Sequence, residues 1–153
     1  MTRTILNLGS ESERAIVGGT WRYARGLVPG EKNEGLVARM AGSDARLINF
    51  DDSEWETTDN IGKWRSDGLT FIWYRIKITI PPIVNGREVE GTRCLLETCI
   101  DDYGEVWIDG ECDRQTGTVQ GFNVPQRVVV NGNPKSGDEH TICLLYTSDA
   151  ADE

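Results

Sequence analysis

The chain has 153 residues, enough for one domain with a sizeable core and too few for two comfortable ones. Its formal net charge of −9 makes nucleic acid and anionic membrane surfaces poor partners, because like charges repel. No run of about 18 apolar residues occurs, so the sequence predicts no membrane-spanning segment. Residues 1–9 lack the basic and then apolar build of a signal peptide, which favours a cytoplasmic protein.

The spacing of turn residues indicates an all-β fold. Gly, Asp and Asn recur at short intervals between clusters of β-branched and aromatic residues, which is typical of a β-sandwich or barrel. Residues 26–43 are rich in glycine and charge and predict a long loop. The expected strands are residues 15–17, 20–24, 47–50, 71–80, 94–100, 105–108, 126–130 and 140–145.

The strand at residues 71–80 has the clearest two-residue period. One face should enter the core, and it carries Ile72, Tyr74, Ile76, Ile78 and Ile80. The other face should point outward, and it carries Trp73, Arg75, Lys77 and Thr79. Pro81-Pro82 should end the strand, because proline cannot donate a hydrogen bond to a ladder.

Residues 94–100 are apolar on both faces and predict a central strand that is covered on both sides. Cys94 and Cys99 lie on this strand an odd number of residues apart, so they face opposite sides and should not bridge each other. The spacings among these two residues, Cys112 and Cys143 do not resemble those of the cysteine ligands in zinc sites. We expect four free thiols that behave as small buried hydrophobic groups.

Residues 101–110, with the sequence DDYGEVWIDG, predict a turn, an alternating strand and a second turn. Val106 and Ile108 should face the core, while Glu105, Trp107 and Asp109 share the opposite face. Asp-Gly at positions 109 and 110 should then reverse the chain.

The C-terminal residues 143–153, CLLYTSDAADE, resemble a translated transposase adapter from sequencing libraries. On this interpretation the chain is a metagenomic fragment, its domain spans residues 1–142, and the tail is adapter-derived. The alternative is a natural acidic tail. If residues 143–153 are foreign, the domain would lack a strand and expose an edge, unless Leu144, Leu145 and Tyr146 fill that place by chance.

Five segments together resemble a known family. They are FDDSEW at 50–55, WYR at 73–75, ITIP at 78–81, DDYGEVWIDG at 101–110 and GFNVPQRVVV at 121–130. Their order and spacing are similar to the galactose-binding-like jelly-roll domain of gluconolactonase-type (senescence-marker-like) proteins. A more distant similarity is to the sugar-binding domain of glycoside hydrolase family 2. The resemblance covers residues 15–142. It implies a β-sandwich of two antiparallel sheets, C-terminally truncated, without catalytic residues and without the propeller that carries lactonase chemistry in fuller relatives.

Two sets of residues suit carbohydrate recognition, which needs an aromatic platform and convergent polar groups. Trp107 with Glu105 and Asp109 forms the first set, and Trp73 with Arg75 and Lys77 forms the second. The alternative is that both indoles are packing groups, covered by a loop or by the missing propeller. We expect Trp21, Trp55 and Trp64 to anchor the core or loops, and Phe50 and Trp55 to bracket a turn.

Catalytic and metal-binding interpretations are weaker. His140 is the only histidine, and we expect it to be a solvated turn residue without a nucleophile beside it. The backbone positions of Glu105 and Asp109 should be roughly 13 Å apart along a strand, too far for a hydrolytic pair. Asp51-Asp52 and Asp101-Asp102 should cap turns, although a structural calcium ion stays an open alternative.

The sequence therefore predicts a non-catalytic carbohydrate-binding or accessory β-sandwich module that needs no cofactor. Its expected partner is a carbohydrate or a catalytic propeller domain of a larger sugar-active protein. Two alternatives stay open, a structural docking domain for a lactonase propeller and a fragment of a lactone or glycoside hydrolase. The ligand-binding residues predicted from the sequence are Trp107, Glu105, Asp109, Trp73 and Arg75.

Overall fold

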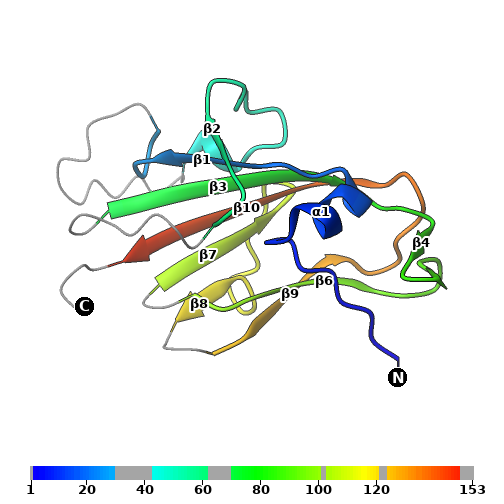
Figure 1. Ribbon diagram of the computed structural model, residues 1–153. Coiled ribbons are helices and arrows are strands. Elements are labelled where there is room, and N and C mark those ends of the chain that lie inside the picture. The colour runs from blue at the N-terminus through cyan, green and yellow to red at the C-terminus, as the bar shows by residue number, and fades with distance from the viewer. Residues whose placement is uncertain (1, 30–42, 62–69, 101–102, 121–123, 149–153) are drawn as a thin grey trace.

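The computed structural model describes residues 2–29, 43–61, 70–100, 103–120 and 124–148, and it is an all-β protein with one short α-helix. Six antiparallel strands form the main sheet in the order β2-β1-β3-β10-β7-β8 (Figure 1). The pairs β4-β5 and β6-β9 form two smaller antiparallel sheets. The elements are α1 (Glu11–Val17), β1 (Trp21–Arg25), η1 (Asp44–Arg46), β2 (Glu56–Thr58), β3 (Thr70–Thr79), β4 (Ile83–Val84), β5 (Arg87–Glu88), β6 (Cys94–Thr98), β7 (Tyr103–Ile108), β8 (Thr118–Gln120), β9 (Gln126–Asn131) and β10 (Glu139–Ser148).

The main core lies on one face of the six-stranded sheet. All five residues predicted for the inner face of β3 are buried in it, which confirms the two-residue period of that strand. Leu96 from β6 and Val128 from β9 join the same cluster, so the two-stranded sheet packs against this face. In Figure 1, β6 and β9 lie below the long strands of the main sheet.

Strand β10 is central to the main sheet, between β3 and β7. It pairs with β3 from Glu139 to Ser148 and with β7 from Ile142 to Thr147. The predicted domain boundary after Ile142 therefore falls inside a strand. Residues 143–145 are buried, so this part of the tail fills the place that a truncated domain would leave open. The adapter origin of residues 143–153 stays a prediction.

Strand β6 is not a central strand. Among the described residues it pairs with β9 alone, and Leu95 on its outer face is 46% exposed. The prediction of a strand covered on both sides was wrong. It rested on Leu95, a single large apolar residue on an outer face that also carries the exposed Glu97. Val129 lies directly opposite Leu95 on β9 and is 44% exposed. The two side chains give the outer face of the β6-β9 sheet an apolar centre.

Two expected strands are absent from the described part of the chain. Residues 15–17 end helix α1, whose first turn carries Glu11 and Glu13 and whose C-terminus is capped by Gly18 in a left-handed conformation with φ 70°. Residues 47–50 follow the short helix η1 as a turn. Both segments are too short for periodicity to separate a strand from a helix or turn. Four strands were missed, namely β2, β4, β5 and β8.

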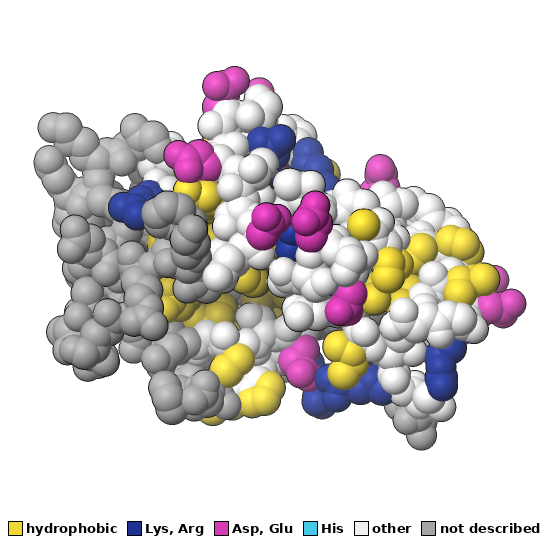
Figure 2. Space-filling view, in the orientation of Figure 1, with side chains coloured by type: hydrophobic (Ala, Val, Ile, Leu, Met, Phe, Trp, Pro, Cys, Tyr) yellow, Lys and Arg dark blue, Asp and Glu magenta, His cyan; other side chains and the backbone are white. Residues whose placement is uncertain are grey.

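Two turns among the described residues have positive φ at two successive positions. Asp109 and Gly110, with φ 52° and 86°, reverse the chain after β7 as predicted. Asn85 and Gly86, with φ 49° and 78°, join β4 to β5 in the same way. In the described part of the chain, no helix is long and apolar enough to cross a membrane. Figure 2 shows acidic side chains spread over one face of the molecule and hydrophobic side chains gathered in a hollow beside the residues drawn in grey.

Candidate functional site

A second cluster of buried residues lies on the opposite face of the main sheet. It contains Trp73 from β3, Trp107 from β7, and Cys143 and Leu145 from β10, with Ala45 from η1 above them. Phe50 and Trp55 pack at its margin. The segment at residues 43–55 therefore covers the face that the sequence places outward.

Trp107 is buried rather than presented as an open platform, with only 8% of its surface exposed. Its ring centroid lies 6.5 Å from that of Trp73. The guanidinium carbon atoms of Arg46 and Arg114 lie 5.4 and 5.2 Å from its centroid. The prediction of an exposed stacking face is wrong, because these cations occupy the positions that a stacked sugar would need.

Glu105 is the polar centre of this region. Its carboxylate accepts hydrogen bonds from the Tyr103 hydroxyl at 2.7 Å, Trp107 Nε1 at 3.0 Å and Arg114 Nη1 at 2.8 Å. Burial, followed by the hydrogen bond to Glu105, raises the pKa of Tyr103 to about 12. The same carboxylate raises the pKa of Arg114 through a hydrogen bond and charge attraction. Three donors thus hold Glu105 as a fixed acceptor beside the indole.

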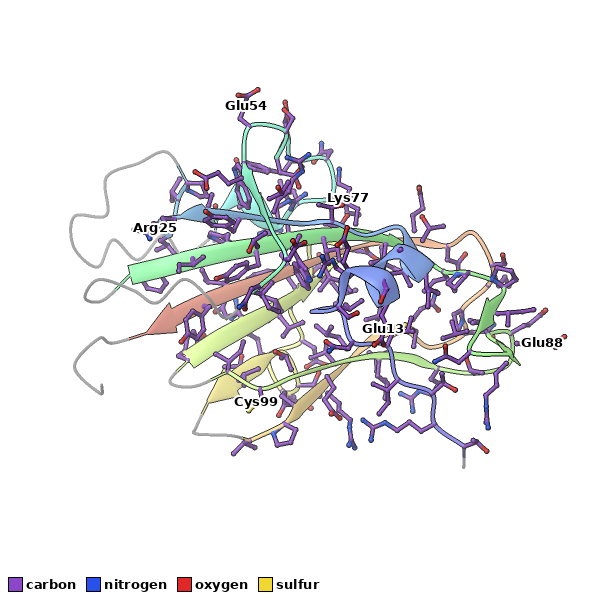
Figure 3. All side chains as sticks on the ribbon, viewed as in Figure 1. Glu13, Arg25, Glu54, Lys77, Glu88 and Cys99 are labelled. Carbon is purple, nitrogen blue, oxygen red and sulfur yellow. The ribbon has the colours of Figure 1, made fainter. Side chains whose placement is uncertain are left out.

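Trp73 is also buried, which corrects the expectation that its face of β3 points into solvent. Its Nε1 donates to the carbonyl oxygen of Leu27 at 3.0 Å, so a loop residue satisfies the buried indole. Lys77, on the same face of β3, is exposed, and Figure 3 shows it at the upper side of the molecule. Among the described residues, Leu27 and residues 43–55 cover Trp73 and Arg75, whereas Lys77 and Thr79 farther along β3 are exposed.

Arg75 fastens the covering segment to the sheet. It is fully buried and donates from Nε to Asp52 at 2.9 Å and from Nη1 to the carbonyl oxygens of Leu47, at 3.0 Å, and Ala45. Its guanidinium also lies 5.4 Å from the ring centroid of Phe50. The outward, ligand-facing position expected for Arg75 is wrong, because its ion pair and carbonyl contacts turn it into a structural clamp.

Neighbouring contacts support the same clamp. Arg22 lies opposite Arg75 in the backbone register of β1 and β3. Its side chain donates to the carbonyl oxygens of Ser53 and Trp55. The ring centroids of Phe50 and Trp55 lie 5.4 Å apart, which confirms that the two rings bracket the turn at Asp51-Asp52. Asp51 accepts from the backbone N–H of Ser53 at 3.0 Å, as predicted for a turn cap.

All four cysteines are free thiols, as expected, although Cys99 is exposed rather than buried. Cys143 is the most enclosed, with Arg75 Nη1 at 3.2 Å from its sulfur. Burial raises the pKa of the Cys143 thiol to about 11, and the positive charge of Arg75 opposes part of that rise. This thiol is neutral at ordinary pH and belongs to the packing of the cluster.

Among the described residues, two buried guanidinium nitrogen atoms have no hydrogen-bond acceptor, Arg75 Nη2 and Arg46 Nε. Arg46 donates from Nη1 to the carbonyl oxygen of Gly110 at 3.0 Å, and no carboxylate partner of Arg46 is found among the described residues. Buried donors are ordinarily satisfied by protein, water or ligand. Of these two arginines, Arg46 is the one that lies over the Trp107 ring.

Asp109 separates from the other predicted ligand-binding residues. In the turn after β7 it accepts from the backbone N–H of Thr141 at 2.8 Å and lies 2.7 Å from His140 Nδ1. His140 Nε2 lies 3.0 Å from Asn131 Nδ2, whose amide is held by Asp138 and the N–H of Asn133. Nε2 must therefore accept and Nδ1 donate. The expectation of a solvated His140 is wrong, since Asp109 and Asn131 enclose it.

The structure thus brings Glu105, Trp107 and Trp73 together, bonds Arg75 to the covering segment on the same face of β3 as Trp73, and removes Asp109 to a separate network. Asp101 and Asp102 lie outside the described residues. In the part of the chain that is described, no group of three or more His, Cys, Asp or Glu side chains is arranged to hold a metal ion. Arg46 and Arg114 were missed because they lie outside regular strands, where periodicity says nothing about contacts.

No protein-family model matches the sequence, and no curated protein matches it either.

Proposed function

We propose that this chain is a galactose-binding-like β-sandwich of the jelly-roll type. Its path supports the proposal, because the chain moves repeatedly between the six-stranded sheet and the β6-β9 sheet. From β3 it crosses to β6, returns to β7 and β8, crosses to β9 and returns to β10. Such crossings between two antiparallel sheets are typical of jelly rolls and other Greek-key sandwiches. Residues from both sheets share one core cluster.

We further propose that the module is non-catalytic and binds carbohydrate at the Trp107 rim, defined as Trp107, Glu105, Arg114 and Arg46. The observation that supports this proposal most strongly is an indole surrounded by a fixed carboxylate and two guanidinium groups. Sugars are recognised by aromatic rings together with charged hydrogen-bonding groups. Because three donors already hold Glu105, its role in this proposal is positioning and hydrogen bonding.

The test uses an exposed rim residue, since replacing the buried indole would disturb the fold. We expect the full chain to bind members of a glycan array and Arg114→Gln to lose most of that signal. Arg127→Gln is the matched control, because Arg127 also pairs with a glutamate, Glu97, but lies on the β6-β9 face. An array without any signal for the unaltered chain, or equal loss in both variants, would contradict the proposal.

A docking role for a gluconolactonase-like propeller is the second candidate. The observation that favours it is the exposed apolar pair Leu95 and Val129 on the outer face of the β6-β9 sheet. Burial of this pair would stabilise an interface through removal of apolar surface from water. We expect Leu95→Lys to abolish co-purification with a recombinant propeller of this class. Unchanged co-purification, or none with the unaltered chain, would contradict a docking role for this face.

A further inference from the structure

The charges around Trp107 do not balance locally. Arg114 has Glu105 as its partner at 2.8 Å, and Arg75 has Asp52 at 2.9 Å. Arg46 has only the carbonyl oxygen of Gly110 among the described residues. Half-buried charges in proteins are ordinarily paired, because desolvation without compensation is costly. In a chain of net charge −9, this lone guanidinium is a local exception.

The unused donors lie on one connected piece of structure. Arg46 Nε is buried and lacks an acceptor, and Arg75 Nη2 is in the same state. Arg75 is bonded to the carbonyl oxygens on either side of Arg46, those of Ala45 and Leu47, so the clamp fixes the backbone that carries Arg46. A donor held in this way is preorganised for an acceptor that the described residues do not supply.

Solvent reaches this region through Arg114, whose side chain is 61% exposed. Glu105 also accepts hydrogen bonds from Tyr103 and Trp107, so Arg114 can move from the indole without leaving that carboxylate without donors. Arg114 also keeps donors other than Nη1 for an incoming ligand. The rim therefore has one fixed and one movable guanidinium beside the same indole.

We propose that the Trp107 rim is selective for sugars that carry a carboxylate, with the carboxylate on Arg46 and the sugar ring taking the place of Arg114 against Trp107. This inference rests on the proposed carbohydrate function and adds the ligand class. Guanidinium groups bind carboxylates through paired, charge-assisted hydrogen bonds. A neutral sugar would leave Arg46 without a counter-charge, whereas an acidic sugar supplies one.

The test is a titration of the full chain by isothermal calorimetry with three probes, D-glucose, D-glucuronate and acetate. Glucose and glucuronate share the pyranose ring and differ in the carboxylate, while acetate has the carboxylate alone. We expect glucuronate to bind at least tenfold more tightly than either of the others. Arg46→Gln should remove this preference, Arg46→Lys should retain part of it, and Arg127→Gln should leave it unchanged.

Four outcomes would overturn the inference, and they are distinguishable. Equal affinity for glucose and glucuronate would refute acidic selectivity while leaving carbohydrate binding intact. Acetate binding as tight as glucuronate binding would show a simple anion site. Absence of binding by both sugars would refute the proposed function itself. Unfolding curves of the Arg46 variants identify any loss that comes from unfolding, and a glucuronate preference unchanged in folded Arg46→Gln would also refute the assignment.

Discussion

The Asp52–Arg75 pair gives the sharpest test of how the outer face of the sheet is covered. Arg75 is fully buried, and in the part of the chain that the structure describes its one charged acceptor is Asp52, at 2.9 Å. Asp52→Asn keeps the side-chain shape and one acceptor oxygen but removes the negative charge that faces the Arg75 cation. Removal of one partner from a buried pair costs about 3–5 kcal/mol.

The expected cost is at the lower end of that range. Asp52 has 14% of its side chain exposed, and Arg22 Nε lies 3.8 Å from its other carboxylate oxygen. We therefore expect Asp52→Asn to lower the free energy of unfolding by about 3 kcal/mol. For a domain of this size, that corresponds to a fall in Tm of roughly 6–12 °C.

Urea denaturation followed by tryptophan fluorescence measures this cost directly. Glu97→Gln is the control, because Glu97 pairs with Arg3 and Arg127 on the exposed face and should contribute little. Acrylamide quenching should also increase in Asp52→Asn if Trp73 and Trp107 lose their cover. Similar stability in Asp52→Asn and Glu97→Gln, without a change in quenching, would refute the role assigned to Arg75.

Three further predictions concern the second cluster, a tight turn and the central strand. The pKa of Cys143 rises from 9.0 to about 11 by burial, so stability should fall between pH 9 and 11 as the unfolded thiol ionises first, by up to about 3 kcal/mol. Cys143→Ala should flatten that decline in unfolding measured against pH, and an unchanged slope would contradict it. Gly117→Ala should lower the free energy of unfolding by about 1–3 kcal/mol, because a Cβ there would lie 2.8 and 2.9 Å from the backbone oxygens of Asp113 and Val106. Gly132→Ala is the control in thermal unfolding and should be neutral, because a Cβ at that position meets nothing within 4 Å. Truncation after Ile142 should abolish cooperative unfolding in circular dichroism, since β3 and β7 would lose the strand between them; a retained transition would show that residues 143–148 are dispensable.

The sequence predicts strands well where burial alternates over many residues. In β3 the inner side chains form an unbroken row of large apolar groups, so a slip of one residue would expose the whole row. In β7 the same period separates Val106 from Trp107, and they enter different clusters. The Asp-Gly turn after β7 could also be predicted, because few residues adopt positive φ at both central positions.

The covering of the outer face could not be predicted from that period. Alternation shows which side of its own strand Trp73 or Trp107 occupies. It does not show whether that side is open to solvent or covered by a loop, because the alternation of the strand is the same in both cases. Cover comes from contacts distant in sequence, such as Arg75 with Asp52 and Arg46 with Gly110. Such pairs lie in turns and loops, where hydrogen bonding rather than hydrophobic period decides the structure.

The indole N–H resonances offer the most direct measurement of the central claim, that the Trp107 rim is the carbohydrate-binding surface. Trp107 Nε1 is bonded to Glu105, whereas Trp21 Nε1 is bonded to the carbonyl oxygen of Leu8 inside the main core. In a ¹⁵N-labelled chain titrated with D-glucuronate, the Trp107 resonance, assigned with Trp107→Phe, should shift while that of Trp21 stays fixed. A saturating titration in which the Trp107 resonance does not move would contradict the account.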